Sequence, residues 1–141
     1  MAVAAIHLPN KESIVNFLYS VYWWISWVIL LVGMSAIIRY ARGYISGKVY
    51  DGVDRGLMAG FTGLLDLQAV TGLIFFLWSG VSGPGFSVYR VPHGVVMFFT
   101  VVIPHLSALW KHTDDRTRYL NNFYLLLTSF LLMLVGLALI P

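Results

Sequence analysis

Long apolar runs alternate with short polar segments along the chain, and each run is long enough to cross a membrane. The runs predict four helices, over residues 14–38, 57–78, 93–110 and 122–140. About 20 apolar residues in a helix match the roughly 30 Å core of a bilayer. The segments between them predict loops at residues 39–55, 79–92 and 111–121. Because short loops favour antiparallel neighbours, we expect an all-α, integral membrane four-helix up-down bundle, a single domain over residues 1–141.

The composition supports a membrane protein and excludes several classes of function. Of the 141 residues, 59% are hydrophobic and 11% are charged, whereas a soluble domain carries about 25% charged residues. The chain has no Cys, which excludes disulfides, thiolate metal sites and haem attached through a CxxCH motif. Few polar residues lie within the spans, which argues against a transporter. The net charge of +3 does not indicate nucleic-acid binding, because the basic residues lie at helix ends, where membrane topology explains them.

The basic residues also predict the orientation in the membrane. Seven of the nine Lys and Arg residues lie in the first and third loops. The positive-inside rule places these loops in the cytoplasm and both termini outside. The start of the chain lacks the pattern of a signal peptide, so we expect the first span to remain in the mature protein, with Ser13 as a helix cap.

Two histidines in the third span, His93 and His105, are the first candidate functional residues. Ionisable side chains inside a membrane segment are costly and often mark function. The two lie about 18 Å apart along the helix and roughly 120° apart around it, so they cannot bind one metal ion together. The other histidines, His7 and His112, lie outside the spans, which excludes a bis-His haem within this bundle. Each candidate ligand therefore needs a partner on another helix or another chain.

Two side chains are candidate partners for His105. Met34 lies at a similar depth in the first span, and a His/Met pair can hold a b-type haem. Asp66 is the only acidic residue within a span and lies near the same depth. It could orient the imidazole by accepting a hydrogen bond from one ring nitrogen, or it could only tie two helices together.

His93 has candidate partners at the opposite end of the bundle. Tyr19 or Tyr22 lies at its depth, and Tyr is a known haem ligand. Met97 follows His93 by one helical turn, so imidazole and thioether could hold copper, although a Met at this spacing is more often packing. We expect water at the interface to satisfy His93, and we therefore expect His105 to matter more.

The second span also carries a run of small residues. Gly56, Gly60 and Gly63 share one face, where the backbone of another helix could approach closely. On the same span, Gln68 could hydrogen-bond within the bundle or meet a quinone carbonyl. In the first span, five aromatic residues form either an interfacial belt or a cofactor wall: Tyr19, Tyr22, Trp23, Trp24 and Trp27.

Three segments resemble a small bacterial family of four-helix membrane proteins, some of them labelled cytochrome b-like. The segments are DLQAVTGLIFF (66–76), PHGVVMFFTVVIPHL (92–106) and LALIP (137–141). The residues that match the family's pattern are Asp66, Gln68, Gly72, His93, Met97 and His105. The His that opens the family's first helix is Tyr19 here, so the natural partner of His93 is missing. The resemblance implies a protein of a prokaryotic cell membrane.

The resemblance leads us to expect a small transmembrane subunit of a membrane-bound redox complex, of respiratory or monooxygenase type. Such a subunit would pack against larger membrane subunits and could hold a b-type haem. The alternatives are a haem-free structural or assembly subunit and a free-standing b-haem electron carrier. In each case we expect a non-catalytic protein with no catalytic residue of its own.

Overall fold

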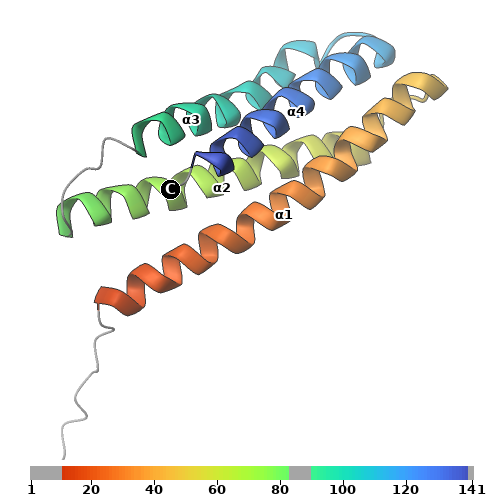
Figure 1. The fold of residues 1–141 in the computed structure, drawn as a ribbon. Coiled ribbons are helices and arrows are strands. Elements are labelled where there is room, and N and C mark those ends of the chain that lie inside the picture. Colours follow the sequence, from red (N-terminus) through yellow and green to blue (C-terminus); the bar gives the residue numbers. More distant parts are fainter. Residues whose placement is uncertain (1–10, 83–89, 140–141) are drawn as a thin grey trace, which may run out of the picture.

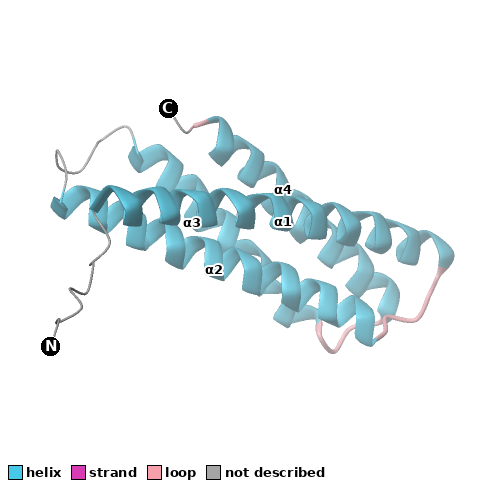
Figure 2. Ribbon diagram, turned by 90° about the horizontal axis from the view of Figure 1, so that it is seen from below, coloured by secondary structure: helices cyan, strands magenta, loops and turns pink. Residues whose placement is uncertain are grey.

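The computed structural model describes residues 11–82 and 90–139, and within them every long element is a helix. The elements are α1 (Lys11–Ser46), α2 (Gly52–Ser82), α3 (Val91–His105), the short 3-10 helix η2 (Leu106–Trp110) and α4 (Asp115–Ala138). Four segments, one in each long helix and the third extended by η2, are long and apolar enough to cross a membrane. The predicted all-α membrane bundle is confirmed, and the helices run alongside one another (Figure 1, Figure 2).

Each helix of the bundle packs against two neighbours. α1 lies against α2 and α4, and α3 lies against α4 and, over a smaller interface, against α2. α1 and α3 therefore occupy diagonal positions. This order decides which of the predicted partners can meet.

The helices extend further than their apolar runs. The predicted loop 39–55 is wrong, because α1 continues to Ser46 and α2 already begins at Gly52. α1 ends at Gly47, whose φ of 62° is left-handed, and the N–H of Lys48 donates to the carbonyl of Gly43 at 3.1 Å. This arrangement is a Schellman cap, which glycine adopts without strain. Charged residues at a membrane edge remain helical until such a stop signal. A prediction from hydropathy alone therefore places the end of the helix too early.

The other helix ends differ from the prediction in smaller ways. α1 begins before Ser13, which is therefore not its cap. α4 begins at Asp115, because the carboxylate of Asp114 accepts a hydrogen bond from the backbone N–H of Thr117 at 2.9 Å. The predicted span 93–110 is divided into α3 and η2 just after Pro104, which has no N–H to donate within the helix.

The core of the bundle is apolar at mid-length and aromatic towards the loop at residues 47–51. Ile29, Phe61, Leu65 and Leu126 are fully buried in its middle. At the loop end three tyrosine rings pack together with centroids 5.0 to 5.9 Å apart: Tyr40, Tyr50 and Tyr119. By contrast, the tryptophans of α1 face outwards, which suits an interfacial belt better than a cofactor wall: Trp23, Trp24 and Trp27.

Candidate functional site

A buried carboxylate organises the end of the bundle near the loop at residues 47–51. Asp54 is 0% exposed and accepts hydrogen bonds from Arg39 Nε at 2.5 Å, from the Tyr119 hydroxyl at 2.5 Å and from the backbone N–H of Asp51 at 3.0 Å. The Tyr40 hydroxyl donates to the backbone carbonyl of Asp54 at 2.6 Å. A buried charge is stable only when it is paired and hydrogen-bonded. Asp54 obtains its partners from neighbouring helices, so these contacts join α1, α2 and α4. We call these five residues the Asp54 network.

The sequence did not point to this network, because its residues fall in two segments that we predicted to be loops, 39–55 and 111–121. The signal that could have revealed it is the pair of acidic residues Asp51 and Asp54, three residues apart in a segment that also contains Arg39 and several tyrosines. At the edge of the network, the backbone N–H of Asp54 donates to Asp51. This hydrogen bond and the ammonium of Lys48 hold the pKa of the Asp51 carboxyl well below its usual range.

A chain of hydrogen bonds, each donated towards Asp54, links Asn122 to this network. The Asn122 Nδ2 lies 3.0 Å from the Tyr50 hydroxyl, which in turn lies 3.1 Å from the Tyr40 hydroxyl. Since Tyr40 donates its only proton to the carbonyl of Asp54, Tyr50 must donate to Tyr40. Tyr50 can then only accept from Asn122, which fixes the amide orientation. The Asn122 Oδ1 is left with no partner although the residue is only 2% exposed.

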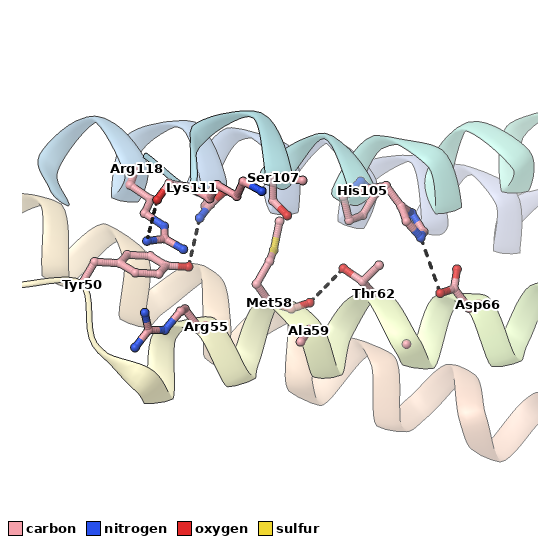
Figure 3. A pocket seen from close by; sticks show the side chains of 14 residues that line it. Tyr50, Arg55, Met58, Ala59, Thr62, Asp66, His105, Ser107, Lys111 and Arg118 are labelled. Carbon is pink, nitrogen blue, oxygen red and sulfur yellow. Dashed lines mark hydrogen bonds and ion pairs between the residues drawn. The ribbon is translucent and has the colours of Figure 1, made fainter. Parts of the chain in front are cut away.

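Asn122 also lines a cavity of about 500 Å³ between α2, the α3–η2 segment and α4. Figure 3 shows Arg55, Lys111 and Arg118 at the same end of this cavity as Tyr50, with Asp66 and His105 at the opposite end. Arg55 and Asp66 are eleven residues apart on α2, so the cavity extends about 16 Å along the helix. It is lined by charged and polar side chains at both ends.

The basic end of the cavity carries uncompensated positive charge. Among the described residues, no carboxylate lies within ion-pair distance of Arg55, Lys111 or Arg118. The Arg118 guanidinium lies 4.1 Å above the Tyr50 ring, and its Nη1 donates to the backbone carbonyl of Lys111 at 3.5 Å. Its Nε is buried without a partner. The lining of this cavity therefore contains three cationic side chains and one unpartnered acceptor, the Asn122 Oδ1.

The predicted approach of Asp66 to His105 is confirmed. Asp66 Oδ2 lies 3.5 Å from His105 Nε2, and both side chains are about half exposed. The His105 Nδ1 donates to the carbonyl of Val101 at 2.9 Å, one turn earlier on the same helix. Met34 is not brought to His105, because α1 lies diagonally from α3 and the Met34 side chain is 47% exposed.

His93 is held by protein groups, and the expectation that interfacial water satisfies it is wrong. Its Nε2 lies 3.3 Å from the Tyr22 hydroxyl of α1, and its Nδ1 lies 2.8 Å from the carbonyl of Gly136 of α4. His93 therefore links α1, α3 and α4. Tyr19, the other predicted partner, is 58% exposed and faces away from the bundle.

Met97 packs beside His93 against α4. A Cβ added to Gly136 would lie 2.8 Å from Met97 Sδ, so the thioether fills the space that this glycine leaves. Gln68 donates to the Ser26 hydroxyl at 2.7 Å and thereby ties α2 to α1, the first of the two roles expected for it. In the described part of the chain, no group of three or more His, Cys, Asp or Glu residues is arranged to hold a metal ion.

These contacts do not fit a b-type haem inside the bundle. An axial histidine needs a free ring nitrogen and, for a six-coordinate iron, a second ligand across the ring plane. Both nitrogens of His93 and both nitrogens of His105 face protein groups. Of the three predicted second ligands, Met34 and Tyr19 are exposed on α1, and the Tyr22 hydroxyl contacts His93 Nε2 directly at 3.3 Å.

Comparison of the chain with protein-family models, with curated proteins and with solved structures finds no match.

Proposed function

We propose that the protein is a haem-free structural subunit of a membrane-bound redox complex, of respiratory or monooxygenase type. Its partners are larger membrane subunits and the lipid bilayer. The redox part of the proposal is supported by the resemblance of residues 66–76 and 92–106 to the cytochrome b-like family. The non-catalytic part is supported by the geometry, because His93, Gln68 and the Asp54 network all join helices.

The observation that carries the proposal is the outward position of one set of glycines. At Gly56, Gly60 and Gly63, which we call the glycine strip, an added Cβ would meet nothing within 4 Å. At Gly33 and Gly43, by contrast, an added Cβ would collide with rings of the core. No other described helix of the bundle therefore packs against these three positions. A flat face on a membrane helix lets another helix approach closely, which makes it a suitable contact for a larger subunit.

The orientation of the subunit follows from its basic residues. In this proposal the loops at residues 47–51 and 111–114 face the cytoplasm of a prokaryotic cell and both termini face outside. Arg42, Lys48, Arg55, Lys111, Arg116 and Arg118 all belong to that end of the bundle.

Affinity purification from native membranes tests the subunit proposal. We expect the tagged protein to retain larger membrane subunits in mild detergent, and we expect Gly60→Leu to lose them because the new side chain fills the strip. Gly94→Leu is the matched control, since Gly94 lies on α3 and is equally open around its Cβ position. Both variants should insert into the membrane. Equal recovery of partners with both variants, or a wild-type protein that runs as a monomer, would refute the proposal.

A further inference from the structure

The cavity between α2, η2 and α4 carries a second role, independent of the proposed redox complex. We propose that it binds an anionic phospholipid whose head group also carries a hydroxyl. Two separate observations support this ligand: the uncompensated cations at one end of the cavity, and the unused acceptor of Asn122 beside them.

The cations select a negatively charged group. Arg55 of α2, Lys111 of the turn after η2 and Arg118 of α4 line the cavity, and none of them is paired with a carboxylate of the described residues. Asp66, the acidic residue of the lining, lies at the far end and faces His105. A phosphate oxygen is a suitable partner for guanidinium and ammonium groups.

The Asn122 carbonyl adds a requirement that charge alone does not impose. Its Oδ1 is buried and unpartnered, and the chain of hydrogen bonds through Tyr50 and Tyr40 prevents the amide from turning round. A buried acceptor without a donor is costly. The occupant must therefore offer a hydrogen-bond donor close to its anionic group, as the glycerol hydroxyls of a phosphatidylglycerol head group do.

The position of the cavity favours a ligand from the bilayer. Ala59 and Gly63 form part of its wall, and both are exposed on the outer surface of α2. Arg55 lies in the first turn of α2 and Lys111 lies just after η2, which places both near the membrane edge, where phosphates lie. An acyl chain can then run along α2 beside the glycine strip.

Native mass spectrometry of the purified protein after exchange into defined lipids tests this inference. The probes are phosphatidylglycerol, phosphatidylmethanol and phosphatidylcholine with identical acyl chains. Phosphatidylmethanol has the same phosphodiester charge as phosphatidylglycerol but no head-group hydroxyl. We expect retention to fall in the order phosphatidylglycerol, phosphatidylmethanol, phosphatidylcholine. The double substitution Arg55→Gln/Lys111→Gln should lower phosphatidylglycerol retention about tenfold, because each cation near the surface contributes to the attraction of an anionic lipid.

Arg42→Gln is the control, because Arg42 is an exposed cation at the same end of the bundle that does not line the cavity. Equal retention of phosphatidylglycerol and phosphatidylmethanol would overturn the role of Asn122. Retention in the double variant equal to that in Arg42→Gln would overturn the site. Thermal stabilisation by free glycerol phosphate, with none by phosphatidylglycerol, would show that the anion comes from solution and would overturn the lipid assignment.

Discussion

Individual polar residues in this protein act mainly by tying helices together. His93 bonds to Tyr22 and to Gly136, and Asp54 of α2 accepts hydrogen bonds from Arg39 of α1 and Tyr119 of α4. The sequence indicated both histidines and named Tyr22 among the candidate partners of His93, but it did not indicate the carbonyl of Gly136. The predicted pairing of Asp66 with His105 was correct because the depths of two residues on neighbouring antiparallel helices can be counted from the helical rise. The contact between His93 and Tyr22, rather than Tyr19, depends on the rotation of α1, which its nearly uniform hydrophobicity does not determine.

Removing the Tyr119 hydroxyl should destabilise the bundle. Tyr119→Phe deletes a 2.5 Å hydrogen bond to the buried Asp54 carboxylate and keeps the ring. A hydrogen bond to a charged group contributes about 2 kcal/mol, so we expect the free energy of unfolding to fall by about that amount. Denaturant unfolding in detergent micelles measures it. Tyr124→Phe is the control because Tyr124 is exposed on the same helix, and an equal effect of the two substitutions would contradict the role of the network.

Substitution of His93 should cost more stability than substitution of His105, the reverse of the order that the sequence suggested. His93→Leu loses contacts to two other helices, whereas His105→Leu loses one contact of 3.5 Å to another helix and one within its own helix. At about 1 kcal/mol for each hydrogen bond between helices, we expect His93→Leu to be the less stable variant. The same unfolding measurement compares the two. A less stable His105→Leu would show that the Asp66 contact dominates.

Helix ends and helix contacts depend on local signals that hydropathy does not report. The sequence predicted the number, order and membrane character of the helices, since each apolar run is long. It misplaced the end of α1 and the starts of α2 and α4, because these ends are set by residues in polar segments: Gly47, Asp51 and Asp114. The glycines of α1 and α2 look alike in sequence, yet they differ in whether a ring packs on them.

Gly43 should tolerate no side chain. The ring of Tyr119 lies against it, so a Cβ at this position would overlap the ring. Overpacking a core typically costs 1 to 3 kcal/mol, and we expect Gly43→Ala to lower the unfolding free energy by about 2 kcal/mol. Gly56→Ala is the matched control, since the space around Gly56 is open. If Gly43→Ala were as stable as Gly56→Ala, the packing of α1 against α4 would have to differ from that described.

The N-terminus of α4 should be sensitive to acid. Hydrogen bonding from the backbone N–H of Thr117 lowers the pKa of the Asp114 carboxyl. Since the folded-state pKa lies below the unfolded one, the charged cap stabilises the protein above the unfolded pKa, and this stability is lost as the pH falls through the folded pKa. Asp114→Asn keeps a capping side chain without the charge. We expect the difference in unfolding midpoint between wild type and Asp114→Asn to shrink between pH 7 and pH 3, and a constant difference would contradict this.

For the whole molecule, the arrangement of helices determines which polar side chains can meet and therefore which sites can form. α1 and α3 lie diagonally, which separates Met34 from His105, and no count of depth along the chain could reveal this. The cavity arises where α2 and α3 share their smaller interface, and its basic end combines residues from three elements. Such combinations depend on helix rotation and neighbour order, which the apolar pattern leaves undetermined.

The orientation of the molecule can be tested by cysteine labelling, which is favoured by the absence of native Cys. We expect Lys48→Cys and Thr113→Cys to react with a membrane-impermeant maleimide only after the cells are opened, because both positions belong to the basic end of the bundle. Labelling of either position in intact cells would reverse the proposed topology.

The most direct test of the account is the haem content of this chain purified alone in mild detergent, measured by its optical spectrum and a pyridine haemochrome assay. Because the ring nitrogens of His93 and His105 face protein groups, we predict no Soret band and no haem per chain. One b-type haem per chain, lost in His93→Ala or His105→Ala, would contradict the haem-free subunit and would require a different arrangement of α1 and α3.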